Sequence, residues 1–132
     1  MPKYVVERIS RVLNESARSI NKSKILILGV TYKSDIKDTR ESPALDVIEL
    51  LEEAGAKINY NDPFVSEIVW NDSKHISVRL TANLIKKMDL CVILTNHQKF
   101  DYQWIVNNSR AVFDTRNATK NVTSGRSKIT LL

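Results

Sequence analysis

The sequence predicts an α/β protein whose parallel sheet is covered by helices on both faces. Two observations carry this prediction: runs in which every side chain is apolar, at residues 25–28 and 90–94, and helical patterns of apolar residues between such runs. A strand that is apolar at every position is typical of a parallel sheet buried on both sides. Alternation of such strands with helices predicts crossover connections. We therefore expect a sheet of about four to five strands.

The first half of the chain contains three well-marked elements. Apolar residues recur at helical spacing from residue 3 to about residue 20, which predicts an amphipathic N-terminal helix. The apolar run 25–28 is the first strand. The second helix begins with Ser42 as its N-cap and Pro43 at its first position, and Gly55 marks its end.

The second half repeats the alternation with shorter elements. Its strands are again apolar runs, and its helices are only a few turns long. The predicted elements are a strand at 57–60, an irregular segment at 64–80 with a short turn of helix near 66–70, a helix at 81–87, a strand at 90–94, a helix at 100–106 and a strand at 111–114. Residues from 118 onward have no periodicity, and we expect them to be loose.

Size and composition limit the class of protein. A chain of 132 residues with 42% apolar and 27% charged residues is one ordinary globular domain. No apolar run approaches the ~18 residues of a membrane span, and no signal peptide is visible. The single cysteine, Cys91, suits a reducing compartment, so we expect a cytoplasmic protein.

The net charge of +5 raises the alternative of a basic nucleic-acid-binding domain. Through residue 101 the basic residues are scattered among acidic ones, and the excess lies near the end of the chain. The sequence has no zinc-finger, RRM or KH signature. Nucleic-acid binding therefore stays a minor alternative.

A cationic segment follows the first strand. Lys33, Lys37 and Arg40 lie between that strand and the helix that begins after Ser42. In open α/β sheets, ligands bind at the carboxyl ends of the strands, and helix N-termini attract anions. The segment therefore predicts a site for a phosphorylated small molecule.

This segment lacks the glycine-rich pattern of a dinucleotide-binding turn. Only Gly29 is present where G-x-G-x-x-G is required for close approach of the backbone to a pyrophosphate. Side chains must then hold the phosphates, with Lys33 as a point charge and Arg40 as a planar fork. The alternative is that both cations only pair with neighbouring acids, namely Asp35, Asp38 and Glu41.

Two further polar residues end predicted strands. Arg116 follows the last predicted strand and should emerge at the same edge of the sheet as Lys33; its alternative is a surface arginine paired with Asp114. Asp62 ends the second strand, where dinucleotide-binding folds place the acid that binds a ribose hydroxyl. Without the glycine pattern, a turn at Asp62-Pro63 is the favoured interpretation, and ribose contact is the minor one.

The histidines and the cysteine favour structural roles. His97 follows a buried strand, and we interpret it as a hydrogen-bonded structural histidine. His97 and His75 lie far apart in the sequence with no third ligand pattern, so no zinc site is predicted. Cys91 lies within an apolar strand, where a free cysteine behaves as a small buried hydrophobe. We expect Phe100 and Tyr102 to lie in the core.

Four ordered motifs resemble one known family, the nucleotide-sugar dehydrogenases that oxidise UDP-glucose, UDP-N-acetylglucosamine or UDP-N-acetylmannosamine at C6. The resemblance covers all but about the last dozen residues. Its motifs are Gly29-Val30-Thr31-Tyr32-Lys33 with Asp35, Asp38 and Arg40 to Ala44; Tyr60 to Pro63; Thr95 to Tyr102; and Val112 to Asn117.

The resemblance implies a function and a set of roles. The chain would be the UDP-binding domain, with a Rossmann-like fold, of an NAD-dependent enzyme that oxidises a UDP-sugar alcohol to a carboxylate for polysaccharide synthesis. Tyr32, Lys33 and Arg116 would contact the UDP-sugar, and Arg40 the NAD diphosphate. NAD would be bound mainly by another domain, and the catalytic cysteine belongs to a motif that this chain lacks, so no catalytic residue is assigned here.

The resemblance also predicts the organisation of the chain. Residues 1–22 would be the end of a central helical region, residues 23–120 the UDP-binding domain and residues 121–132 a loose tail. The chain alone would be inactive, with the remaining domains of a homo-oligomeric enzyme as its partners and no membrane contact. A stand-alone nucleotide-binding regulatory module is the other alternative.

Overall fold

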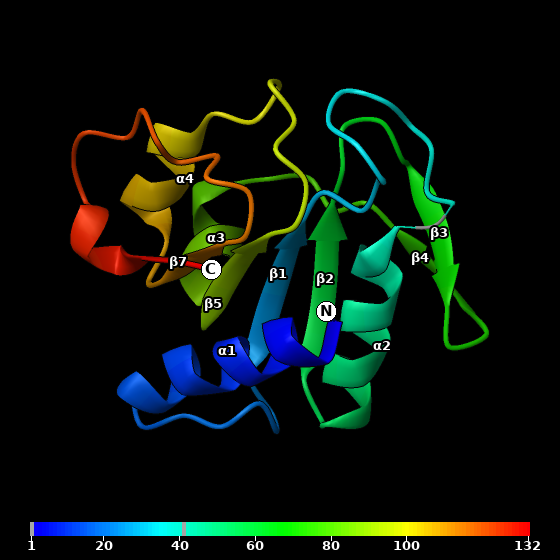
Figure 1. Ribbon diagram of the computed structural model, residues 1–132, viewed down its shortest axis with the longest axis horizontal. Helices are drawn as coiled ribbons and strands as arrows, with labels where there is room; N and C mark the ends of the chain where they lie inside the picture. The colour runs from blue at the N-terminus through cyan, green and yellow to red at the C-terminus, as the bar shows by residue number, and fades with distance from the viewer. Residues whose placement is uncertain (1, 41) are drawn as a thin grey trace.

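Five parallel strands form the centre of the molecule in the computed structural model, which describes residues 2–40 and 42–132 (Figure 1). Their order is β2-β1-β5-β6-β7, and a separate two-stranded hairpin lies beside them. The elements are α1 (Pro2–Glu15), β1 (Lys24–Leu28), α2 (Pro43–Glu53), β2 (Lys57–Asn61), β3 (Glu67–Trp70), β4 (Ser73–Ile76), α3 (Ala82–Lys87), β5 (Leu90–Ile93), α4 (Tyr102–Asn108), β6 (Val112–Asp114), a 3-10 turn (Arg126–Lys128) and β7 (Ile129–Leu131). The predicted fold class is confirmed.

Alternate side chains of the central strands enter two separate cores. Ile25 and Ile27 of β1 face one core, which α1 and α2 cover. Leu26 and Leu28 face the other, which α3 and α4 cover. All four side chains are fully buried. Burial on both faces is the physical reason that β1 has no polar position after its first residue.

The second helix begins and ends where the sequence predicts. The Ser42 side chain accepts a hydrogen bond from the Ala44 N–H, and Pro43 occupies the first helical position. At the other end, the Gly55 N–H donates to the Glu52 carbonyl and the Ala56 N–H to the Leu51 carbonyl. These two bonds form a Schellman motif.

The first helix is shorter than predicted. It ends at Glu15 instead of continuing to about residue 20. Ala17 adopts a left-handed conformation with φ 59°, and the Arg18 N–H donates to the Leu13 carbonyl across 3.0 Å. This closing bond turns the chain toward β1, which apolar periodicity alone does not reveal. The last helix, α4, also begins two residues later than predicted, after the Asp101 N-cap.

Residues 64–80 contain a β-hairpin in place of the predicted turn of helix. β3 and β4 pair in antiparallel register, and Asn71 and Asp72 connect them with φ of 48° and 62°. Two residues with positive φ form a type I′ turn, which suits the twist of a two-stranded hairpin. The hairpin packs toward α2, where the Trp70 Nε1–H donates to Glu52 across 2.8 Å.

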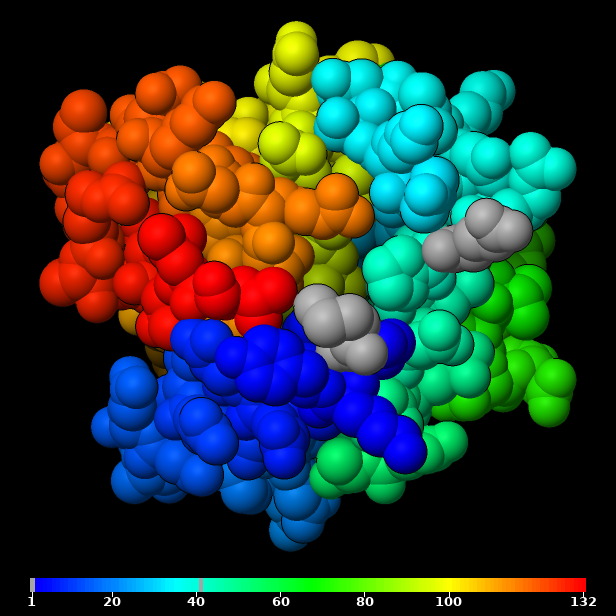
Figure 2. All heavy atoms as spheres, viewed as in Figure 1, coloured from blue at the N-terminus to red at the C-terminus, as the bar shows by residue number. Residues whose placement is uncertain are grey.

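The C-terminal residues are ordered, so the prediction of a loose tail at 121–132 is wrong. Ile129–Leu131 form β7, which pairs in parallel with β6. The Arg8 Nη2 of α1 donates to the Leu131 carbonyl across 2.9 Å. Figure 2 shows the red C-terminal residues lying against the blue first helix. Within the part of the chain that the structure describes, no helix has the length and apolar character of a membrane span.

Candidate functional site

The strand order identifies one edge of the sheet as the place for a ligand. From β1 the chain moves outward to β2, and it later returns on the other side of β1 to form β5. Ligands in open α/β sheets bind at such a switch point, outside the carboxyl ends of the strands. Here the segment after β1, residues 29–42, meets the segment after β5, residues 94–101, and both lie at the top of Figure 1. We call the first segment the β1–α2 loop.

The two segments are in close backbone contact at Gly29. This residue has φ +88°, and a Cβ atom added to it would lie 2.6 Å from the Thr95 Cβ and 2.8 Å from the Thr95 carbonyl oxygen. The Thr95 hydroxyl donates to the Thr31 carbonyl across 2.9 Å. Glycine is therefore required here by the approach of β5, whereas the sequence suggested only an incomplete phosphate-binding pattern.

A buried carboxylate–imidazole pair lies under this contact. The side chains of Asp62 and His97 have no exposed surface, and His97 Nε2 lies 2.9 Å from Asp62 Oδ2. The same carboxylate oxygen accepts the Val30 N–H across 2.8 Å. The structural interpretation of His97 is confirmed. Asp62 forms its turn by accepting the Phe64 N–H, and since its side chain is buried, it does not offer an oxygen to a ribose.

Tyr32 and Lys33 project from the β1–α2 loop into solvent. Both side chains are exposed, and the Lys33 Nζ lies 5.7 Å from the centre of the Tyr32 ring. Thr31 beneath them is buried, and its hydroxyl donates to the Lys33 carbonyl across 2.6 Å. The backbone is therefore held while the aromatic ring and the ammonium group stay accessible.

Two acidic residues of the loop, Asp35 and Asp38, already accept hydrogen bonds. Asp38 accepts a two-point hydrogen bond from Arg40, with both N–O distances 3.0 Å, and this hydrogen-bonded guanidinium holds the pKa of the Asp38 carboxyl below its ordinary value. Asp35 Oδ1 accepts the Gln98 N–H. The predicted alternative of neighbouring pairs thus applies to Arg40, while pairing with Glu41 lies outside the described residues.

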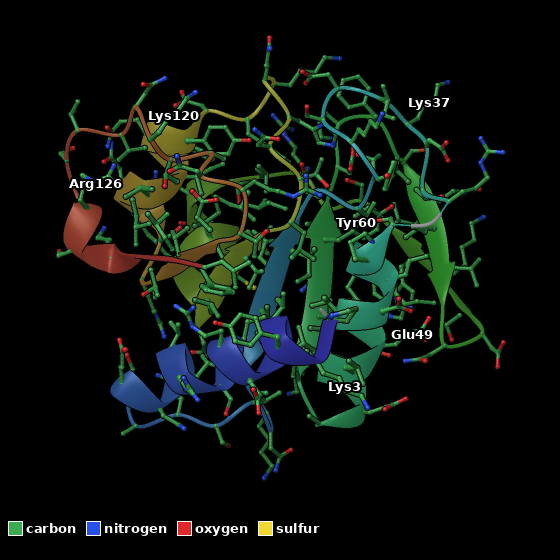
Figure 3. All side chains as sticks on the ribbon, viewed as in Figure 1. Lys3, Lys37, Glu49, Tyr60, Lys120 and Arg126 are labelled. Carbon is green, nitrogen blue, oxygen red and sulfur yellow. The ribbon has the colours of Figure 1, made fainter. Side chains whose placement is uncertain are left out.

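Lys33 and Lys37 form no ion pair with another described residue. Lys37 lies near the top of the loop in Figure 3, pointing away from the sheet. The positive charges of Lys33 and Lys37 are therefore not neutralised by an ion pair with a described carboxylate. An anionic group is the ligand that this charge favours.

Arg116 lies at the same edge but lines different hollows. Its backbone N–H donates to Asp114 Oδ1, whereas its side chain is exposed and forms no ion pair with a described residue. It lines an apolar hollow of about 220 Å³ together with Pro43, Ala44 and Thr115. The carboxyl end of β6 and the start of α2 therefore meet at Arg116.

A second, larger hollow of about 570 Å³ lies on the other side of Arg116. Amide side chains line much of it, including Asn96, Asn117 and Asn121, and Lys120 adds a second positive charge. Lys120 lies at the upper left of Figure 3, on the segment that follows β6. The edge from Lys33 to Lys120 thus combines cations with hydrogen-bonding amides.

Cys91 lies away from this edge. Its side chain is buried in the core beneath α3 and α4, and burial raises the pKa of its thiol to about 11, with a smaller opposing effect of the Ser109 hydroxyl. The predicted structural role is confirmed, because a protonated buried thiol is a poor nucleophile. Phe100 is buried as predicted, and the half-buried Tyr102 donates its hydroxyl to the His97 carbonyl.

Sequence reasoning missed the partnership between Asp62 and His97. Each was considered alone, although both follow strands that adjoin β1 in the sheet. Placing polar residues at the carboxyl ends of neighbouring parallel strands was the available signal. The pair stabilises the loop that presents Tyr32 and Lys33, so its role here is structural support for the exposed edge.

The model of one protein family matches this chain over residues 26–121, and its description is the UDP-glucose/GDP-mannose dehydrogenase family, UDP binding domain. The match covers the sheet from β1 to β6 and the whole candidate site. The chain belongs to this family. The family assignment therefore indicates that the carboxyl edge of the sheet belongs to a UDP-binding domain.

Related proteins agree with this assignment. The UDP-binding domain is 37% identical over 100 residues to a UDP-N-acetyl-D-mannosamine dehydrogenase of Methanococcus maripaludis, which corresponds to 76% of this chain and 22% of the relative. It is 30% identical over 128 residues to the UDP-glucose 6-dehydrogenase of Rickettsia prowazekii, covering 91% of this chain and 29% of that protein. The chain thus spans less than a third of the length of these relatives.

Solved structures have the same fold. The UDP-N-acetyl-mannosamine dehydrogenase of S. aureus superposes with a TM-score of 0.74 at 27% identity, covering 98% of this chain and 30% of that one. A UDP-D-ManNAc dehydrogenase from Pyrococcus horikoshii superposes with a TM-score of 0.76 at 21% identity, covering 98% and 29%. The UDP-binding domain therefore has the architecture of a sugar-nucleotide dehydrogenase domain along its whole length, including α1 and β7.

Proposed function

We propose that this domain binds the UDP part of a UDP-sugar for an NAD-dependent 6-dehydrogenase, which oxidises the C6 alcohol of the sugar to a carboxylate. The supporting observation is Lys33 on the β1–α2 loop, which is exposed and forms no ion pair with a described residue, at the carboxyl edge of a domain whose family binds UDP. A diphosphate is the part of such a substrate that an ammonium group favours.

In this proposal the site residues have separate roles. Lys33 binds a phosphate oxygen, and the Tyr32 ring beside it contacts the nucleotide. Arg116 approaches the same nucleotide from the end of β6, where it is exposed and free of ion pairs with described residues. Binding energy from this remote part of the substrate then holds the sugar near the reacting groups of another domain.

Arg40 is proposed to contact the diphosphate of NAD. The residues of this chain fit only such a peripheral contact, because the turn after β1 lacks the glycines of a dinucleotide cradle. Arg40 is now paired with Asp38, so an anion would have to share or replace that carboxylate. The cofactor would be bound mainly by other domains of the complete enzyme, and this domain alone would not reduce NAD.

The relatives indicate the class of substrate, a UDP-sugar, and not the particular sugar. The proteins named above act on UDP-N-acetyl-D-mannosamine or on UDP-glucose, and both substrates share the UDP group. Recognition of UDP by this domain is therefore independent of which sugar the complete enzyme oxidises. We propose UDP itself as the ligand to test.

A titration with UDP, followed by amide chemical shifts, tests the proposal. We expect weak binding, with shifts concentrated in residues 29–42 and 114–117 and no NAD reduction when a UDP-sugar is supplied. Lys33→Ala should weaken binding about 10- to 100-fold, because a charge-assisted contact is lost. Lys37→Ala is the matched control, since it removes another exposed cation from the same loop. Shifts confined to other regions, or equal losses in the two variants, would contradict the assignment.

A further inference from the structure

We propose that the buried Asp62–His97 pair is a positioning unit that sets the conformation of the β1–α2 loop and hence the affinity of Lys33 for its ligand. The inference rests on the proposed function for the identity of that ligand. The claim that the pair holds the β1–α2 loop does not depend on the identity of the ligand. The pair itself contacts no ligand, because both side chains are fully buried.

The Asp62 carboxylate is saturated by hydrogen-bond donors. Oδ2 accepts the Val30 N–H across 2.8 Å and the His97 Nε2–H across 2.9 Å. Oδ1 accepts the Phe64 N–H across 2.8 Å. Three donors satisfy a buried charge that would otherwise be costly. The carboxylate thus fixes the first residue of the loop after Gly29.

The tautomer of His97 follows from its other nitrogen. Nδ1 accepts the Asp35 N–H across 2.8 Å, so Nδ1 carries no proton. The proton of the neutral ring is then on Nε2, where it is donated to Asp62. The Thr31 hydroxyl oxygen also lies 3.3 Å from Nε2. One imidazole therefore connects the end of β2 to the far side of the β1–α2 loop.

These bonds hold the loop on both sides of Lys33. Val30 is held by Asp62 and Asp35 by His97, so the segment that carries the exposed Tyr32 and Lys33 lies between two buried anchors. Asp35 has φ +62°, a conformation that is unfavourable for a residue with a side chain. Two bonds from outside the loop help to hold Asp35 in this conformation: its N–H donates to His97 Nδ1, and its carboxylate accepts the Gln98 N–H.

Polar bonds matter here because the loop has little apolar burial. Tyr32 is 43% exposed and Ile36 is 39% exposed, so neither large side chain anchors the turn in a core. The imidazole, in contrast, is enclosed by the rings of Phe64 and Phe100, at centroid distances of 4.9 and 5.7 Å. A buried ring thus supports an exposed turn.

Two substitutions separate the two bonds. In His97→Asn, the side-chain oxygen can take the position of Nδ1 and keep the Asp35 N–H bond. In His97→Gln, the amide can reach the position of Nε2 and keep the Asp62 bond only. We expect His97→Gln to lower UDP affinity about tenfold and to expose the Asp35 amide to hydrogen exchange, and His97→Asn to stay within about threefold of the parent protein.

Cys91→Ala is the control, because Cys91 lies in β5, the strand that precedes the His97 segment, and is buried in the core beneath α3 and α4, where its sulfur accepts from the Ser109 hydroxyl. It should leave the Asp35 amide and UDP affinity unchanged. If His97→Gln is folded with unchanged Asp35 exchange, or if the Asn and Gln variants lose affinity equally, the positioning role is wrong.

The unmodified protein provides a second test that needs no substitution. Nitrogen-15 spectra should show an unprotonated Nδ1 on His97, and hydrogen exchange should show a protected Asp35 amide, because the Asp35 N–H donates to that nitrogen. A protonated Nδ1 at neutral pH would overturn the inference. If the parent protein does not bind UDP at all, the proposed function fails, while the exchange measurements still decide the loop anchoring.

Discussion

Replacing Gly29 by alanine tests the close approach of the β1–α2 loop to β5. Gly29 has φ +88°, and the added Cβ would lie 2.6, 2.8 and 2.9 Å from the Cβ, O and N atoms of Thr95. Two of those atoms belong to the backbone that continues β5, so they cannot move aside as a side chain would. Thr95 is fully buried, which leaves no free space on its other side.

The expected loss of stability has two parts. A left-handed conformation costs an alanine about 1–2 kcal/mol relative to glycine. Overpacking against fixed atoms adds about 1–3 kcal/mol. The lower entropy of the unfolded alanine chain returns about 0.4–1 kcal/mol. The net decrease in the free energy of unfolding is therefore about 1–4.5 kcal/mol, with a central value of about 3 kcal/mol.

Gly125→Ala is the matched control for the conformational part. Gly125 has φ +78°, but its added Cβ would meet only the Val106 Cγ1 at 3.0 Å and the Lys128 side chain at 4.0 Å. Its cost should be about 1 kcal/mol, mainly from the positive φ. Urea unfolding monitored by circular dichroism gives both values, with equal m-values required for comparison. If Gly29→Ala is no more destabilising than Gly125→Ala, the contact with Thr95 is not rigid.

Two further predictions concern Cys91 and the loop cations. The pKa of Cys91 rises from its ordinary 9.0 to about 11 by burial, so above pH 9 the unfolded chain loses this proton before the folded one, and stability should fall by roughly 2–3 kcal/mol between pH 9 and 11. Cys91→Ala should cost around 1 kcal/mol near neutral pH, flatten this alkaline loss and leave the turnover of a complete dehydrogenase intact; an inactive but folded variant would contradict the structural role. In that complete enzyme, Lys33→Ala should mainly raise the KM for the UDP-sugar and Arg40→Ala that for NAD, and unchanged constants in both would mean that the loop is a surface turn.

The buried strands could be predicted because burial on both faces leaves a direct trace in the sequence. All four residues of β5 are buried, and so are all residues of β1 except Lys24. An apolar run that alternates with helices along the chain therefore indicates a strand buried on both faces. The start of α2 could also be predicted, because Ser42 caps it through a bond to the nearby Ala44 N–H and Pro43 suits the first helical position. Local chemistry and complete burial are the two features that a single sequence displays.

The hairpin and the last strand leave no such trace. Val69 and Ile76 are 60% and 66% exposed, so the apolar residues of β3 and β4 do not follow burial. The turn at Asn71-Asp72 has positive φ without a glycine, which conceals its type. β7 forms by pairing with β6, so its strand conformation depends on a tertiary contact and not on a pattern in residues 129–131.

The candidate site was predicted in location but not in organisation. The carboxyl edge and the exposure of Lys33 follow from strand order and polarity, which the sequence already indicates. The Arg40–Asp38 pair and the Asp62–His97 pair depend on side-chain distances of about 3 Å. Those distances arise only when separate loops pack together, so sequence spacing cannot decide between the alternatives.

The position of β7 has a consequence for the order in which the molecule can be made. β6 consists of Val112, Phe113 and Asp114, all buried, and β7 covers its outer edge while Arg8 of α1 reaches the Leu131 carbonyl. A nascent chain that has not yet released residues 129–131 from the ribosome has β6 as a bare apolar edge, which is a template for pairing with another chain. The first helix lacks its distant hydrogen-bond partner at the same stage. Pairing of residues 129–131 therefore covers the outer edge of β6 and gives Arg8 its distant partner in a single step.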